Sequence, residues 1–199
     1  MIIELGVAGL IAWYAKKKQD SESPVDLNVD LSALPLAPIS TAGLISRPEA
    51  IVMVPRATIS YTEFDYLILP AAARYGVPVA WVKAFIGKES TFRVNPPVRV
   101  NDQSYGLMQL IPQTARALGF TGRVPALVDG NLVGPNDLLD PATNIDLGVK
   151  LMGQLIRSYG MNFERCYSAY NSGRPDLYKT STEVAANVRG ALDWLAKFD

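Results

Sequence analysis

A carboxylate ends an apolar helical stripe in the stretch FIGKESTF. Val82, Phe85 and Glu89 are spaced so that they share one face of a helix, and an amphipathic helix turns that face toward the core. Partial burial and the nearby helix C-terminus both raise the pKa of such a carboxyl group. Cleavage of a glycosidic bond requires an acid of this kind, because the leaving oxygen is protonated as the bond breaks. The alternative is a helix-terminal Glu that points to water or pairs with Lys88 or Arg93.

The composition restricts which other groups can do chemistry. Among 199 residues there is no histidine and one cysteine, which excludes Ser-His-Asp catalysis, histidine metal sites and an internal disulfide. Cys166 lies at helical spacing from Phe163 and Tyr170, so we interpret it as a buried structural thiol. The 19 basic and 19 acidic side chains balance, and no overall field attracts nucleic acid. Acid–base chemistry must come from carboxylates, tyrosines or lysines.

Two further stretches, SYGLMQLIPQTA and SAYNSG, offer neutral hydrogen-bonding groups. Gly106 permits a sharp turn or a close approach of the backbone to a ligand, and Gln109 offers both a donor and an acceptor. Tyr170 and Asn171 add an aromatic face, a phenol and an amide. Neutral polar groups and an aromatic ring around one acid are typical of a sugar-binding cleft. Taken singly, each has a plainer interpretation, such as Met108 in the core and NSG as a helix stop.

Six helices are expected to position these groups in a mostly helical domain over residues 61–199. Their segments are DYLILPAAARYGV, PVAWVKAFIGKES, PQTARALGF, NIDLGVKLMGQLIRSYG, NFERCYSAYN and STEVAANVRGALDWLAKF. Pro78 occupies a favourable first position of the second helix, while Pro112 opens the third and Gly119 closes it. Residues 91–106 and 121–141 contain too many turn formers for a helix, and we expect short strands or loop in the first of them.

The chain before residue 61 has a different composition. Residues 1–18 hold an apolar run that three lysines follow. At about 1.5 Å per residue this run is shorter than the roughly 30 Å hydrocarbon core of a bilayer. Its positive charges follow the apolar residues rather than precede them, unlike those of a secretory signal. We predict an anchor helix embedded in a membrane or an assembly partner, the alternative being a buried helix at the domain edge. Residues 19–60, with repeated prolines, predict an extended linker.

Four motifs, in their order and spacing, resemble the soluble lytic transglycosylase family of lysozyme-like domains. The motifs are ESTF at residues 89–92, GLMQLIPQTA at 106–115, DPATNIDLG at 140–148 and AYNSG at 169–173. The resemblance covers about residues 66–194 of the chain. It implies a mostly α, α+β lysozyme-like fold and a lyase that acts on peptidoglycan without a metal or cofactor.

The resemblance implies that Glu89 is the sole catalytic carboxylate. Glu89 would protonate the glycosidic oxygen between N-acetylmuramic acid and N-acetylglucosamine, and then act as base on the muramyl 6-hydroxyl, which closes a 1,6-anhydro ring. The N-acetyl group of the substrate would replace the nucleophilic carboxylate, an exception to the two-carboxylate scheme. By the same resemblance, Met108 and Gln109 line the cleft, and Tyr170 and Asn171 hold the substrate or the catalytic Glu. The resemblance also implies that Ser90 supports the site.

Close to these motifs the chain departs from the family pattern. Gln103, Ser104 and Tyr105 stand where small residues often precede the GLMQ motif, and we include Ser104 among the substrate-binding candidates. Arg174 interrupts the usual second Gly-rich turn after AYN. These departures bear on substrate preference rather than on Glu89.

Two other functions compete with this interpretation. A hydrolytic muramidase or chitinase-like enzyme on the same fold needs a second carboxylate, and Asp102 is the acid between the first two motifs, where it is better explained as a turn former. An inactive glycan-binding or structural module would not require Glu89, Gln109, Tyr170 and Asn171 together.

The biological setting follows from the N-terminal segment. Its charge order suits an enzyme that is carried within an assembly before it meets a cell wall. We predict a bacteriophage virion enzyme that opens peptidoglycan locally during genome entry, or alternatively a component of a bacterial secretion or conjugation apparatus. The expected partners are glycan strands and a membrane or assembly partner bound through residues 1–18, with no nucleic acid.

Overall fold

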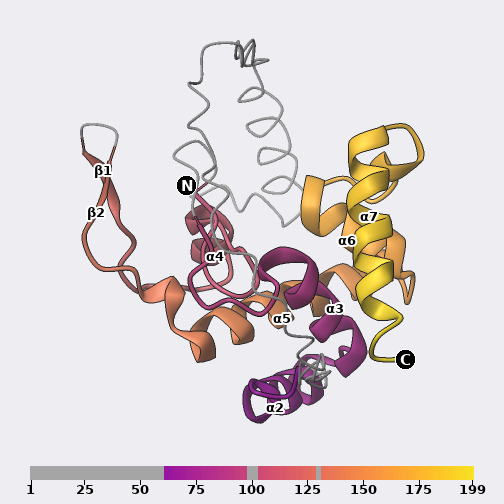
Figure 1. Ribbon diagram of the computed structural model, residues 1–199, viewed down its shortest axis with the longest axis horizontal. Coiled ribbons are helices and arrows are strands. Elements are labelled where there is room, and N and C mark those ends of the chain that lie inside the picture. Colours follow the sequence, from indigo (N-terminus) through magenta and orange to yellow (C-terminus); the bar gives the residue numbers. More distant parts are fainter. Residues whose placement is uncertain (1–60, 98–102, 129–130) are drawn as a thin grey trace, which may run out of the picture. The chain divides into compact units, whose positions relative to one another are not determined.

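Helix α5 (Pro141–Tyr159) contributes the longest buried face in the computed structural model, which describes residues 61–97, 103–128 and 131–199 (Figure 1). Asp140 caps its start, because the carboxylate accepts a hydrogen bond from the Thr143 backbone N–H at 2.9 Å, and Pro141 occupies the first turn. Its buried face includes Ile145, Gly148, Leu151, Met152 and Leu155, at the spacing of a helix that packs against the core.

The other predicted helices are also present, with small changes at their ends. They are α2 (Asp65–Tyr75), α3 (Val79–Ser90), α4 (Pro112–Ala117), α6 (Phe163–Ser172) and α7 (Thr182–Leu195). Two 3-10 helices, η2 (Asp137–Leu139) and η3 (Leu177–Lys179), precede α5 and α7. Pro78 is the N-cap residue of α3 rather than its first helical residue, and α4 ends before Gly119. The mostly helical fold class is therefore confirmed.

Two short strands form the one sheet of the described residues, and they lie in the second irregular stretch rather than the first. Strand β1 (Ala126–Val128) pairs antiparallel with β2 (Asn131–Val133). The intervening sequence, Asp129–Gly130, is a typical two-residue hairpin signal, which explains why pairing occurs here. Within the described part of residues 91–106 there is instead loop, joined to the next segment by a single bridge between Tyr105 and Leu110.

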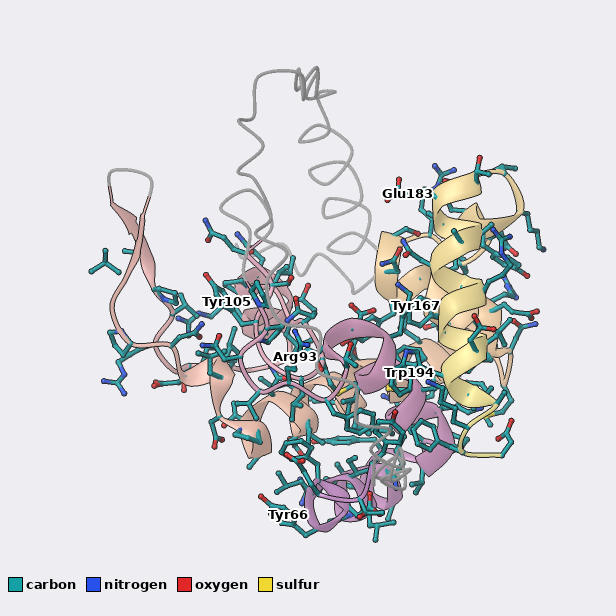
Figure 2. The ribbon with its side chains drawn as sticks, in the orientation of Figure 1. Tyr66, Arg93, Tyr105, Tyr167, Glu183 and Trp194 are labelled. Atoms are coloured by element: carbon teal, nitrogen blue, oxygen red, sulfur yellow. The ribbon has the colours of Figure 1, made fainter. Side chains whose placement is uncertain are left out.

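Helices α3 and α7 pack closely against each other because glycine removes the side chain at their contacts. A Cβ at Gly87 in α3 would collide with the Trp194 ring in α7, and one at Gly190 in α7 would lie 2.8 Å from Cε of Lys88 in α3. Figure 2 shows Trp194 where these two helices meet. This close approach brings α7 beside the end of α3 that carries Glu89.

Cys166 is buried, as predicted, and burial raises the pKa of its thiol to about 11. The anchor predicted for residues 1–18 and the linker predicted for residues 19–60 lie outside the described residues. Among the helices that are described, none combines the length and apolar character needed to cross a membrane.

Candidate active site

Glu89 lies in the last turn of α3, at the end of a buried apolar face. Val82, Phe85 and Ile86 have no exposed surface, whereas Glu89 is half-buried. The predicted stripe therefore exists, and the acid sits where the stripe meets the surface. Thr91 ends the helix in the left-handed region, with φ of 54°. Helix α3 thus ends with Glu89 and Ser90, the two residues of the ES motif.

Tyr167 of α6 is a hydrogen-bond partner of this carboxylate, and it was not among the residues predicted from the sequence. Its Oη donates to Oε1 of Glu89 at 2.6 Å, a short length typical of hydrogen bonds to a charged oxygen. The Tyr167 ring is buried and meets the Phe85 ring edge-on at 4.9 Å between centroids. Figure 2 shows Tyr167 on the side of α3 that faces α6 and α7. A signal existed, because Tyr167 shares a helix face with Tyr170 and Asn171 at spacings of three and four.

Tyr170 and Asn171, both predicted site residues, lie on α6 and make different contacts. Oη of Tyr170 donates to the Met108 carbonyl oxygen at 2.6 Å. Oδ1 of Asn171 accepts a hydrogen bond from Nδ2 of Asn187 at 3.3 Å. Helix α6 therefore holds both the catalytic candidate, through Tyr167, and the GLMQ segment, through Tyr170.

The GLMQ segment is a tight loop closed by two backbone hydrogen bonds. Tyr105 and Leu110 exchange N–H···O bonds of 3.0 Å each, so the residues between them turn sharply. Gln109 has a φ of 46°, which is uncommon for a residue other than glycine. Two side-chain bonds hold it there: its Nε2 donates to the Gly106 carbonyl oxygen at 2.9 Å, and its Oε1 accepts from Oγ of Ser104 at 3.0 Å. Ser104 therefore positions Gln109.

Asn144 of α5 fills the inside of this loop and is a second residue that the sequence analysis missed. It has no exposed surface. Its Oδ1 accepts from the Met108 backbone N–H at 2.7 Å, while its Nδ2 donates to the carbonyl oxygens of Tyr105 at 2.8 Å and Leu138 at 2.9 Å. A side chain at Gly106 would collide with Asn144. Glycine is needed at this position because the loop backbone lies against the amide.

The remaining predicted site residues, Met108 and Ser90, are placed below the surface. Met108 has no exposed surface, and its side chain packs where a Cβ of Gly148 would otherwise lie. Ser90 is also buried, and its Oγ donates to the Ile86 carbonyl oxygen at 3.1 Å. Both residues lie in the core, and a supporting role for Ser90 and a contact of Met108 with substrate stay predictions.

Several other described acids form ion pairs with basic side chains, and these pairs join parts of the fold. The ion pairs are Asp65–Lys83 at 2.7 Å, Asp137–Arg123 at 2.9 Å, Asp146–Arg74 at 2.6 Å and Asp176–Lys179 at 2.8 Å. The hydrogen bond from Arg123 lowers the pKa of Asp137, and that from Lys179 lowers the pKa of Asp176. Among the described residues, no group of three or more metal-ligating side chains comes together. Asp102, the candidate second carboxylate, lies outside the described residues.

We expect Asn144→Leu to lower the free energy of unfolding by about 3 kcal/mol or more, because it removes three hydrogen bonds to buried backbone groups. Urea denaturation of the full chain measures this loss. Asn136→Ala is the control: it removes one capping bond, from the Leu138 N–H at 3.1 Å, and should cost about 1 kcal/mol. Equal losses for the two variants would contradict a central role for Asn144.

Known proteins share this fold and this sequence pattern. Residues 66–189 match the family described as the transglycosylase SLT domain. The chain is 32% identical over 120 residues to the soluble lytic murein transglycosylase of Escherichia coli K12, covering 60% of this chain and 17% of that protein. It is 33% identical over 135 residues to the membrane-bound lytic murein transglycosylase C of Mannheimia succiniciproducens, covering 61% and 35%.

Solved structures show the same fold at lower sequence identity. The 70 kDa soluble lytic transglycosylase of Escherichia coli superposes with a TM-score of 0.55 at 22% identity, covering 68% of this chain and 24% of that one. The chain thus corresponds to a minor part of each of these relatives. Because the match to the family extends over more than half of its residues, the chain belongs to the transglycosylase SLT domain family.

Proposed function

We propose that this chain is a lytic transglycosylase that cleaves the β-1,4 bond between N-acetylmuramic acid and N-acetylglucosamine in peptidoglycan. The observation that carries the proposal is the half-buried Glu89 carboxylate, bonded to Tyr167 at 2.6 Å. Its family membership and the names of its relatives, which are lytic murein transglycosylases, support the same activity. The residues predicted to bind substrate, Ser90, Ser104, Met108, Gln109, Tyr170 and Asn171, are all neutral, as expected for recognition of a sugar rather than an ion.

Glu89 serves first as acid and then as base in the proposed reaction. Its proton passes to the glycosidic oxygen as the bond to C1 of the muramyl sugar breaks. The carbonyl oxygen of the substrate's N-acetyl group stabilises the positive charge at C1, in place of a second carboxylate. The Glu89 carboxylate then takes the proton of the muramyl 6-hydroxyl, whose oxygen bonds to C1 and closes the 1,6-anhydro ring. The enzyme ends the cycle with Glu89 protonated again.

Tyr167 holds the Glu89 carboxylate through one of its oxygens. Its hydroxyl donates to Oε1, which fixes the position of the group that delivers the proton. The same bond stabilises the carboxylate after the proton has left, because hydrogen bonds to an ionised acceptor are stronger than neutral ones. Met108, Gln109, Tyr170 and Asn171 are proposed to form the surroundings in which the glycan is held.

A hydrolytic muramidase is the second candidate, and it differs in the group that attacks C1. Water as the attacking group needs a carboxylate that activates it or stabilises the intermediate. Asp102 is the acid that the sequence offers for this role. The products of such a hydrolase would end in a reducing muramic acid instead of an anhydro ring.

Digestion of purified peptidoglycan by the full chain is expected to release muropeptides that end in 1,6-anhydromuramic acid. Glu89→Gln keeps the size of the side chain but cannot transfer a proton, so the rate should fall by at least about 10²-fold. Mass spectrometry of the soluble products measures both outcomes. Reducing-end products from the wild type would favour hydrolysis, and undiminished cleavage by Glu89→Gln would refute the role of Glu89.

Tyr167→Phe is expected to lower kcat by about 10-fold, because it removes one hydrogen bond to the reacting carboxylate. KM should change little, since the hydroxyl is directed at Glu89 and not at the glycan. Steady-state rates on a soluble glycan oligomer separate the two parameters. Tyr178→Phe removes the hydroxyl of a half-buried tyrosine in η3 and is the matched control. A raised KM with an unchanged kcat would contradict the assigned role of Tyr167.

For the biological setting we propose a virion-associated enzyme of a bacteriophage that acts on the host cell wall, with a bacterial secretion or conjugation apparatus as the second candidate. The proposal is supported by the order of the apolar run and the lysines within residues 1–18. A reporter fused to residues 1–60 should stay uncleaved and associate with membranes or an assembly. A reporter that is cleaved and exported would contradict this setting.

A further inference from the structure

Helix α7 carries a polar residue, Asn187, that connects two parts of the candidate site. Its Oδ1 accepts a hydrogen bond from Nζ of Lys88, the neighbour of Glu89 in α3, at 3.1 Å. Its Nδ2 donates to Oδ1 of Asn171 in α6, at 3.3 Å. All three side chains are half-buried. A chain of two hydrogen bonds therefore runs from Lys88 through Asn187 to Asn171.

The chemistry of the three groups permits only one direction of this chain. The Lys88 ammonium group donates and never accepts, so the oxygen of the Asn187 amide must face it. The nitrogen of Asn187 then faces Asn171, where it needs an acceptor, and Asn171 must present its oxygen. The orientation of both amides thus follows from the charge of Lys88, even though oxygen and nitrogen of an amide have similar shape.

Helix packing holds the three residues in place. The stem of Lys88 lies against Gly190, one turn after Asn187 on α7, at 2.8 Å from the position of an added Cβ. Farther along the same contact, the Trp194 ring covers Gly87. Asn187 itself lies beside the buried face of α7, whose members are Val184, Val188 and Ala191. A polar residue next to this apolar face is better explained by its two bonds than by packing.

We propose that Asn187 is a positioning residue that fixes the Asn171 amide with its NH₂ group directed at the glycan. With its oxygen engaged by Asn187, Asn171 is left as a donor. The acceptors that suit it are the hydroxyl and N-acetyl oxygens of a sugar. Asn187 acts through Asn171 and does not touch substrate. The inference rests on the proposed glycan-cleaving function.

Asn187→Asp tests the direction of these two hydrogen bonds, because the side chain of residue 187 keeps nearly the same shape. A carboxylate accepts at both ends, so the bond from Lys88 is kept and strengthened, while the bond to the oxygen of Asn171 is lost. The Asn171 amide should turn so that its NH₂ group donates to the new carboxylate. Cleavage of peptidoglycan should fall by about 10-fold, with an unchanged or raised Tm. Asp193→Asn, an exposed exchange of acid and amide on the same helix, should leave both the rate and Tm unchanged.

A double-mutant cycle shows whether Asn187 acts through Asn171. In an Asn171→Ala background, Asn187→Asp should have little further effect, because the group that it orients is gone. Equal losses in both backgrounds, or a wild-type rate for Asn187→Asp alone, would overturn the proposal.

Side-chain amide hydrogen exchange, followed by NMR, reads the same orientation without any activity. In the wild type the NH₂ group of Asn187 should exchange more slowly than that of Asn171, and in Asn187→Asp the NH₂ group of Asn171 should become the slower one. The opposite order in the wild type would overturn the proposal. An inactive wild-type protein with the expected exchange order would instead refute the proposed function. The orientation of the Asn187 and Asn171 amides would still stand.

Discussion

The hydrogen bond between Tyr167 and Glu89 is the interaction around which the site is organised. It joins α6 to the last turn of α3, across 78 positions of the sequence. A carboxylate that is half-buried beside an apolar face loses part of its hydration, and it needs a partner that compensates this loss. A phenol on a neighbouring helix provides that partner without adding a charge. The acid is therefore held in one position at the end of α3.

A second constraint keeps the GLMQ loop in the shape that the site requires. Gln109 has a left-handed backbone conformation, which persists only where surrounding contacts determine it. Here those contacts are the bonds of its own side chain to Gly106 and Ser104, and the buried amide of Asn144 inside the loop. Tyr170 ties the same loop to α6. One helix thus fixes both the acid and the loop.

Much of the fold was predictable from the sequence, because its helices are long, periodic and marked by prolines and glycines at their ends. Glu89 was also predictable, as an acid at an apolar position of a helical stripe. The same argument applies to Asn144, which lies one turn before Gly148 on the buried face of α5, and to Asn187 beside the buried face of α7. A polar residue at a core position is thus the common signal of this site.

The partners of these polar residues were not predictable. Which tyrosine of α6 reaches Glu89 depends on how α3 and α6 pack. The sequence alone does not distinguish Tyr167 from Tyr170 as the partner of Glu89. The burial of Met108 depends on Gly148 of a different helix. The described part of residues 91–106 is loop, one of the two predicted alternatives, whereas the strand pair of residues 126–133 was not predicted, although the sequence between its strands is a hairpin signal. The sequence thus predicted the helices, whereas the contacts between them became known only from the structure.

The central claim is that Glu89 alone performs both proton transfers and that the substrate's own 6-hydroxyl, not water, closes the reaction. The most direct test is digestion of peptidoglycan by the full chain in 18O-labelled water, with mass spectrometry of the muramyl ends. We expect products whose new muramyl end contains no label, because its C1 oxygen comes from the sugar. Labelled muramyl ends would contradict it, since they show that water attacked C1 and that a second group activated it.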